Sequence, residues 1–193
     1  MLIWSDDSKI AIDCGLGSMK RTRAALNPTF DCPGNVDSVL VTHTHSDHIS
    51  HYPLRVIQEY GIELHIHQDS VDQLKYKHYK DKKFDTLKIS DFDNNSFKAG
   101  KFIIQAVKVP HHPAYNTSGF VIRYKNNGKW KKAVIASDFN DGQYMFEHLI
   151  DADFIYIESN HDLAMLKQFP NPNSHYHMSN PKTAKLLCNA INQ

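Results

Sequence analysis

The alternation of apolar and polar positions changes period several times along the first half of the chain. Apolar runs of strand length end in polar or glycine residues, and segments with helical spacing follow them. Ser18 can cap a helix that ends before Pro28, and Gly61 suits the end of another helix. The pattern predicts strands over residues 9–13, 37–42 and 62–67, and helices over residues 18–26, 54–60 and 70–80.

Strand patterns dominate the second half. Residues 119–124 and 131–136 flank the step Asn127-Gly128, which is a strong hairpin signal. Further strands are predicted over residues 102–107 and 154–157, the latter buried, and helices over 162–168 and 181–191. Because both halves contain strands and helices, we expect an α+β protein, with two sheets packed face to face and helices outside in a four-layer αββα sandwich. The length of 193 residues suits a single domain over residues 1–193.

Composition excludes several classes of protein. Lys and Arg number 22 against 21 Asp and Glu, and a net charge of +1 gives no overall attraction to nucleic acid, so any basic patch must be local. No apolar run approaches the roughly 18 residues of a membrane helix, and no export signal is visible at the N-terminus. The three cysteines are scattered, without a C-x-x-C pair, which argues against disulfides and thiolate zinc and favours the cytoplasm.

The thirteen histidines are clustered, and one cluster carries a metal-binding pattern. His43, His45, Asp47 and His48 form H-x-H-x-D-H directly after a predicted buried strand. Imidazole nitrogen and carboxylate oxygen suit a divalent ion such as zinc. Alternation sends His43 and His45 to one point, and the following turn lets Asp47 and His48 face a second. Four ligands in so short a loop exceed what one tetrahedral ion needs, so two adjacent metals are predicted; the alternative is an accident of a histidine-rich chain.

This pattern resembles the signature of the metallo-β-lactamase superfamily, whose fold is an αββα sandwich with a dinuclear site at one edge. The resemblance extends in order over nearly the whole chain. Residues 12–15 resemble its early hydrophobic-Asp-x-Gly turn, residues 109–112 with 119–120 its third-histidine strand, and residues 136–138 its bridging-aspartate strand. Residues 157–162 with 165–166, and residues 177–180, resemble segments of the WalJ-type branch, bacterial and phage proteins regarded as DNA exonucleases.

The resemblance implies a ligand set. The first metal would be held by His43, His45 and one of His111 and His112, and the second by Asp47, His48 and His177, with Asp138 bridging. The spacing of seven residues from His112 to Gly119 fits the branch, so His112 is our choice, although the Val109-Pro110 step favours His111. The chain starts too late to contain the Ser/Gly-rich first strand of the branch, and His51 stands where the branch usually has glycine.

Other polar residues have competing interpretations. Asp13 could be a third-metal ligand, but we expect it to accept backbone N–H groups from the histidine motif. Glu158 either orients a ligand histidine or is a structural carboxylate. His161 is a candidate for protonating a leaving group, against a polar residue at a helix start. His175 could chelate beside His177, but the family match falls on His177. His65, His67 and Cys14 are expected to be ordinary strand or core residues.

One stretch, residues 75–83, is rich in lysine and interleaved with aromatic residues. Lysine could contact phosphates and tyrosine could stack on bases. The alternative is a solvated helix end, where lysine is common.

These features together predict a dinuclear metal-dependent hydrolase. Two divalent ions, zinc first and manganese second, would lower the pKa of a bridging water so that a hydroxide acts as nucleophile. We expect a phosphodiesterase, a DNA exonuclease in particular, with Asp47 and His161 as catalytic residues. The alternatives are a hydrolase of a cyclic phosphodiester, thioester or lactam, and a non-catalytic metal-bound interaction protein. DNA is the expected partner, no membrane is expected, and the sequence does not indicate an oligomeric state.

Overall fold

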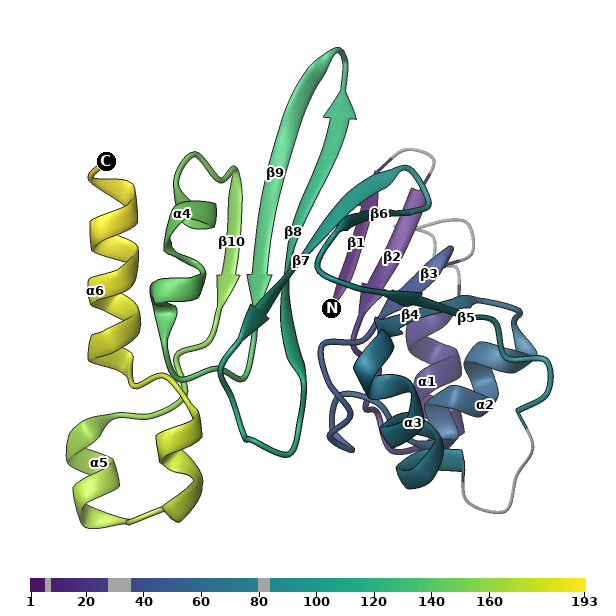
Figure 1. Ribbon diagram of the computed structural model, residues 1–193, viewed down its shortest axis with the longest axis horizontal. Coiled ribbons are helices and arrows are strands. Elements are labelled where there is room, and N and C mark those ends of the chain that lie inside the picture. The colour runs from purple at the N-terminus through teal and green to yellow at the C-terminus, as the bar shows by residue number, and fades with distance from the viewer. Residues whose placement is uncertain (6–7, 28–35, 80–83) are drawn as a thin grey trace. The chain divides into compact units, whose positions relative to one another are not determined.

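The computed structural model describes residues 1–5, 8–27, 36–79 and 84–193. Its internal contacts divide the chain into two compact units. The first comprises residues 1–93 and 97–102, and the second comprises residues 94–96 and 103–193. Each unit contains most of one sheet and has an apolar core of its own (Figure 1).

The sheet of the first unit has the order β1-β2-β3-β4-β5. Its strands are β1 (Leu2–Ser5), β2 (Ser8–Ile12), β3 (Ser38–Leu40), β4 (Glu63–His67) and β5 (Ile89–Phe92). Only the β1–β2 pair is antiparallel. The inner parallel strands β2, β3 and β4 are fully or largely buried, as expected where helices cross over between them, whereas the edge strand β5 is partly exposed. The connecting helices are α1 (Met19–Leu26) and α2 (His51–Glu59), which pack on a core that includes Leu54, Ile57 and Leu64.

The predicted strands and the first two helices of this unit are confirmed with shifted ends. Ser18 caps α1 by accepting the backbone N–H of Arg21 at 3.2 Å, and Gly61 has the positive φ expected after α2. The helix predicted over residues 70–80 is instead three short turns. They are the 3₁₀ turn η1 (Gln68–Ser70), the α-helical turn α3 (Val71–Leu74) and the π-helical turn η2 (Lys75–Tyr79); residue 80 lies outside the described residues.

The sheet of the second unit has the order β10-β9-β8-β7, with β6 (Ser96–Ala99) beside β7, where the chain passes between the units. Its strands are β7 (Phe102–Val109), β8 (Thr117–Asn126), β9 (Lys129–Ala136) and β10 (Phe154–Ile157). The predicted hairpin joins β8 to β9, and Asn127 and Gly128 both have positive φ. The strand β10 pairs in parallel with β9.

The helices of the second unit are α4 (Phe146–Leu149), α5 (Leu163–Gln168) and α6 (Asn180–Ile191), with 3₁₀ turns η3 (Gly142–Tyr144) and η4 (Pro172–Tyr176). In Figure 1, α4 and α6 lie beside the β10 edge of the sheet. The prediction that β10 is buried is wrong, because Phe154 and Tyr156 are each about half exposed at this edge. The short elements β1, β5, β6 and α4 were not predicted. Within the described residues, no helix is long and apolar enough to cross a membrane.

Candidate metal centre

The histidine loop, residues 42–48, follows β3 in the first unit. Nε2 of His43, a fully buried residue, lies 2.7 Å from Nδ1 of His45. Nε2 of His48 lies 3.8 Å from Oδ2 of Asp47, whose side chain is 82% exposed. The loop therefore brings His43 close to His45 and His48 close to Asp47, and the rings of His43 and His48 are also adjacent, with centroids 4.1 Å apart.

Asp13, directly after β2, holds the histidine loop. Its φ of 55° is a left-handed conformation that Asp tolerates better than most residues. Oδ1 accepts the Thr42 N–H at 2.8 Å, and Oδ2 lies 2.8 Å from Nδ1 of His48. Nδ1 of His48 is therefore the ring atom that donates to the Asp13 carboxylate, and Nε2 is the ring atom on the side of Asp47. The predicted role of Asp13 as acceptor of a loop N–H is confirmed.

Cys14 follows Asp13 and belongs to the apolar core of the first unit, as predicted. Its backbone N–H donates to the carbonyl of His48 at 2.6 Å. Burial raises the pKa of its thiol to about 11, so the side chain stays neutral and is neither a nucleophile nor a thiolate ligand.

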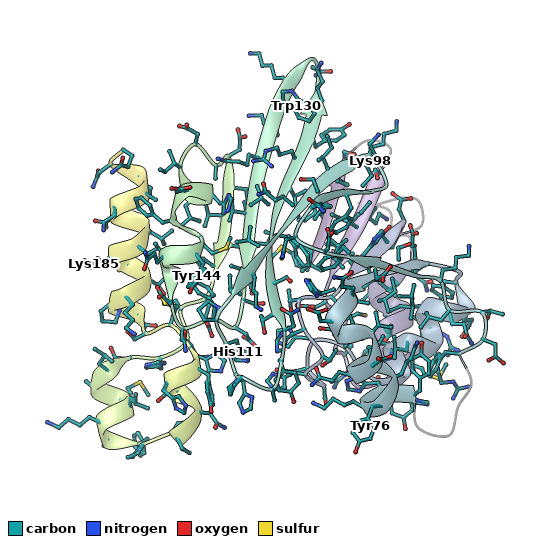
Figure 2. The ribbon with its side chains drawn as sticks, in the orientation of Figure 1. Tyr76, Lys98, His111, Trp130, Tyr144 and Lys185 are labelled. Carbon is teal, nitrogen blue, oxygen red and sulfur yellow. The ribbon has the colours of Figure 1, made fainter. Side chains whose placement is uncertain are left out.

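In the second unit, Asp138 lies between two histidines from different segments. It follows β9 with a φ of 53°. Its Oδ2 is 4.0 Å from Nε2 of His111, which follows β7 and is labelled in Figure 2. Its Oδ1 is 3.9 Å from Nδ1 of His177, which follows η4. The carboxylate therefore faces one histidine with each oxygen.

His111 rather than His112 is the histidine beside Asp138. The His111 side chain is 2% exposed, and its Nδ1 donates to the Tyr176 carbonyl at 3.1 Å. Burial lowers the pKa of His111, which keeps the imidazole neutral as a metal ligand requires. His112, the residue chosen from the sequence, instead accepts the Ala114 N–H at Nδ1 and packs against the ring of Tyr176. The geometry therefore favours His111.

Glu158, directly after β10, holds His177. Its Oε1 lies 2.5 Å from Nδ1 of His177, and its Oε2 accepts the backbone N–H groups of Phe139 at 2.8 Å and Met178 at 3.3 Å. Burial raises the pKa of this carboxyl, and these N–H groups and His177 oppose that shift. Of the two interpretations left open by the sequence, the contact supports orientation of a ligand histidine.

The donor set fits divalent metal ions. Asp138, Glu158 and His177 bring one ligand atom each to within 4.8 Å of one another. Ligand atoms on one tetrahedral zinc lie roughly 3.3 Å apart, given bonds of about 2.0–2.1 Å. The distance from Nε2 of His48 to Oδ2 of Asp47 is 3.8 Å, and that from Nε2 of His111 to Oδ2 of Asp138 is 4.0 Å. Both exceed the spacing expected on one zinc by less than 1 Å.

Three further candidates from the sequence are His175, His161 and the lysine-rich stretch. His175 turns its Nδ1 to the Pro172 carbonyl at 2.5 Å and stacks on Tyr176. His161 pairs with Ser179 through a backbone bridge. Of the lysine-rich stretch, Lys80, Lys82 and Lys83 lie outside the described residues.

The sequence did not single out two groups that orient the ligands. The Thr42 hydroxyl lies 3.1 Å from Nδ1 of both His43 and His48 and contacts Asp13, and its position next to the motif was the available signal. The Tyr176 carbonyl that accepts from His111 leaves no sequence signal, because every residue carries a carbonyl.

Comparison with known proteins identifies the fold. The family model described as the β-lactamase superfamily domain matches residues 8–192. The metallo-β-lactamase fold protein YhfI from Bacillus subtilis has 19% identity and a TM-score of 0.72, covering 98% of this chain and 73% of that one. A diphosphatase from the PhnP family has 14% identity and a TM-score of 0.70, covering 98% and 68%. Human tRNase Z, short form, has 17% identity and a TM-score of 0.67, covering 98% and 80%.

These identities show the fold alone, and they confirm the predicted α+β metallo-β-lactamase fold. A search of curated protein sequences found no match. Because the family model spans almost the whole chain, the protein belongs to the family of β-lactamase superfamily domains.

Proposed function

We propose that this protein is a dinuclear metal-dependent phosphodiesterase that acts on nucleic acid, with DNA as the first candidate. The observation that carries the proposal is shared by both units. His48, His111 and His177 each turn Nδ1 to a fixed acceptor, namely Asp13, the Tyr176 carbonyl and Glu158. Metal-binding histidines are oriented in this way. In His48 and His111 the other nitrogen, Nε2, lies on the side of Asp47 and Asp138, whereas His177 approaches both Glu158 and Asp138 with Nδ1.

The proposed ligand set draws on both units. The proposed ligands are His43, His45, Asp47 and His48 of the first unit and His111, Asp138 and His177 of the second, for two ions per chain. His111 replaces His112 because only His111 faces Asp138. Nitrogen and oxygen donors without thiolate suit zinc, and manganese is the second candidate.

The two ions, when bound, would lower the pKa of a water molecule and stabilise charge on the phosphoryl oxygens. The residues of this chain supply orientation. Asp13 and Glu158 fix the rings of His48 and His177, so the ligand atoms need little rearrangement when metal binds. His161 remains our candidate for protonating the leaving group, and its backbone bridge to Ser179 fixes its position.

Assignment to the WalJ-type branch is part of the proposal. The two segments that carry that resemblance form one hydrogen-bonded assembly in the second unit. The Asn160 N–H donates to the Met178 carbonyl at 2.9 Å, and the Ser159 hydroxyl donates to Oδ1 of Asn180 at 2.8 Å. With the Glu158–His177 contact, the segments together fix one ligand histidine. The solved diphosphatase and tRNase Z of the same fold lend further support to a phosphorus ester as substrate.

Metal content and substrate are tested together. Protein purified without chelator should contain close to two ions of zinc or manganese per chain. A value consistently below one, with no gain on adding metal, would exclude the dinuclear site. The metal-loaded protein is then assayed on single- and double-stranded DNA, on RNA, and on a cyclic dinucleotide, a thioester and a lactam. Hydrolysis of only one of the last three would favour the small-molecule alternative.

A matched pair of aspartate variants completes this experiment. Asp138→Asn should abolish turnover and leave the fold intact, because a shared ligand would be lost. Asp141, three residues on, caps η3 by accepting the Gln143 N–H at 2.9 Å, and Asp141→Asn should retain activity. An inactive Asp141 variant beside an active Asp138 variant would show that the wrong aspartate is assigned.

A further inference from the structure

A cavity of about 420 Å³ opens beside the histidine loop within the first unit. Its walls include Ser46, Ser50, His51, Tyr52, Lys77 and His78. Ser46 stands between the proposed ligands His45 and Asp47, so the cavity borders the metal-binding segment. No acidic side chain is among the described residues that line it. We call this cavity the Lys77 pocket.

Two buried histidines fix the wall of the Lys77 pocket. Nδ1 of His51 lies 3.0 Å from the His78 carbonyl, and Nε2 of His78 lies 2.9 Å from the Thr44 carbonyl. Carbonyl oxygens can only accept, so both ring nitrogens are donors. This relay ties α2, η2 and the histidine loop together. His51, which stands where the related branch usually has glycine, is therefore a part of this wall.

The relay also fixes the position of Lys77. Lys77 precedes His78 in the π-helical turn η2, and π-helical turns occur often at functional sites. Because His78 is 5% exposed and bonded to the histidine loop, the backbone of its neighbour is fixed beside Ser46. The lysine is thus a wall of the pocket and not only a member of a solvated helix end.

The chemistry of the pocket suits a nucleotide. An ammonium group and hydroxyls are common partners of phosphate. The Ser46 hydroxyl and the Lys77 ammonium group are therefore the candidate phosphate partners in this wall. Tyr52 is 46% exposed, which leaves part of its ring available for stacking on a base. The volume lies within the range of about 300–1,000 Å³ usual for ligand pockets.

We propose that the Lys77 pocket binds the nucleotide next to the scissile phosphodiester. Lys77 and Ser46 would contact its phosphate, and Tyr52 would stack on its base. This inference rests on the proposed function and names its substrate more closely. The preferred substrate is a polynucleotide with a phosphate next to the scissile bond, whereas an isolated phosphodiester lacks that phosphate and its base.

The first test compares two substrates of the metal-loaded enzyme. Thymidine dinucleotide phosphorylated at both ends carries a phosphate on either side of the scissile bond, whereas bis(4-nitrophenyl) phosphate carries none. Lys77→Gln should lower kcat/KM for the dinucleotide about tenfold more than for the small ester, mainly through KM, because a charge-assisted contact is lost. Lys77→Arg should keep most of the parent's kcat/KM for the dinucleotide, because arginine retains the positive charge. The ribonucleotide counterpart of the dinucleotide shows whether DNA or RNA is preferred.

Matched controls lie on the same turn. Lys75 and Tyr76 belong to η2 and do not line the pocket, and Tyr76 is 89% exposed at the edge of the unit (Figure 2). Lys75→Gln and Tyr76→Leu should therefore leave the ratio of kcat/KM for the dinucleotide and the small ester unchanged. Tyr52→Leu should lower kcat/KM for the dinucleotide about tenfold. Equal effects of Lys77→Gln and Lys75→Gln would overturn the proposal.

A binding measurement separates this proposal from the proposed function. Thymidine 3′,5′-bisphosphate is titrated calorimetrically into the metal-loaded parent and both lysine variants. Weaker binding to Lys77→Gln alone supports the pocket even if the parent hydrolyses no phosphodiester, in which case only the proposed function fails. The same affinity for both lysine variants would exclude the pocket as a nucleotide site, whatever the activity.

Discussion

Nδ1 of His48 and Oδ2 of Asp13 lie 2.8 Å apart, although 35 positions separate the two residues in the chain. The second unit repeats this relationship between His177 and Glu158 at 2.5 Å. In both cases a carboxylate directly after a strand orients a histidine on a loop. Because the strand end is rigid, each carboxylate fixes the orientation of its histidine before any metal binds.

Replacing Asp13 should test this preparation. Asp13→Asn keeps the left-handed backbone but loses the charged acceptor of His48, so we expect metal affinity to fall about 10- to 100-fold. Titration with zinc against a competing chelator measures the change. Asp91→Asn, on an exposed position of β5, is the control and should bind metal as the parent does. Unchanged affinity in the Asp13 variant would mean that His48 needs no such partner.

The sequence predicted the strands around the site well because their signals are local. Residues 119–124 and 131–136 alternate around an Asn-Gly turn, and the structure contains that hairpin. The prediction of one helix over residues 70–80 was wrong, and the reason is a contact with a distant part of the chain. His78 is bonded to the Thr44 carbonyl of the histidine loop, and the turn that carries it is π-helical instead of α-helical.

In the candidate site, too, local features could be predicted from the sequence and long-range contacts could not. The proximity of the four side chains of H-x-H-x-D-H follows from their places in one short loop and could be predicted. The choice between His111 and His112 could not, because both spacings are acceptable in the sequence. Only the fold shows that Nδ1 of His111 meets the Tyr176 carbonyl, 65 positions away, and turns Nε2 toward Asp138.

Gly15 gives a steric test of the first unit. A Cβ built on Gly15 would lie 1.7 Å from the carbonyl oxygen of Asp47, a backbone atom that cannot move alone. Gly15→Ala should therefore displace the histidine loop and lower the free energy of unfolding by about 3 kcal/mol or more. Gly128→Ala, in the β8–β9 turn, meets no atom within 4 Å and should cost only about 1 kcal/mol through its positive φ. Denaturant titration measures both, and equal costs would contradict the steric argument.

His65 should make stability depend on pH. It is 4% exposed on β4 and stacks on Phe97, and burial lowers its pKa, an effect that Glu63 partly opposes. The unfolded chain therefore binds more protons as the pH falls through the ordinary value of 6.5, and the folded state loses stability there. His65→Phe should reduce the loss of unfolding free energy between about pH 7.5 and 5.5. Replacing the exposed His175 with Gln should leave the slope of the parent unchanged.

His177 and His175 can be separated by substitution. His177 is held by Glu158, whereas His175 turns its Nδ1 to the Pro172 carbonyl. We expect His177→Ala to lose one of the two proposed ions together with activity, and His175→Ala to retain both. Elemental analysis and the DNA assay decide the matter, and equal losses would mean that both histidines line the site.

His111 and His112 offer the sharpest test of the ligand assignment, because they are adjacent and chemically identical. His111 is nearly inaccessible and faces Asp138, so His111→Ala should remove a metal ligand and leave a buried gap. We expect zinc affinity to fall by at least about 100-fold and turnover to be lost, since loss of a direct ligand should exceed the 10- to 100-fold effect of an outer partner. His112→Ala should cost only its ring contact with Tyr176 and retain zinc. His111→Gln, which fills most of the gap, should still bind zinc poorly, and this variant separates lost ligation from lost packing. If His112→Ala loses zinc and His111→Gln retains it, the third ligand is His112, as the spacing to Gly119 had suggested.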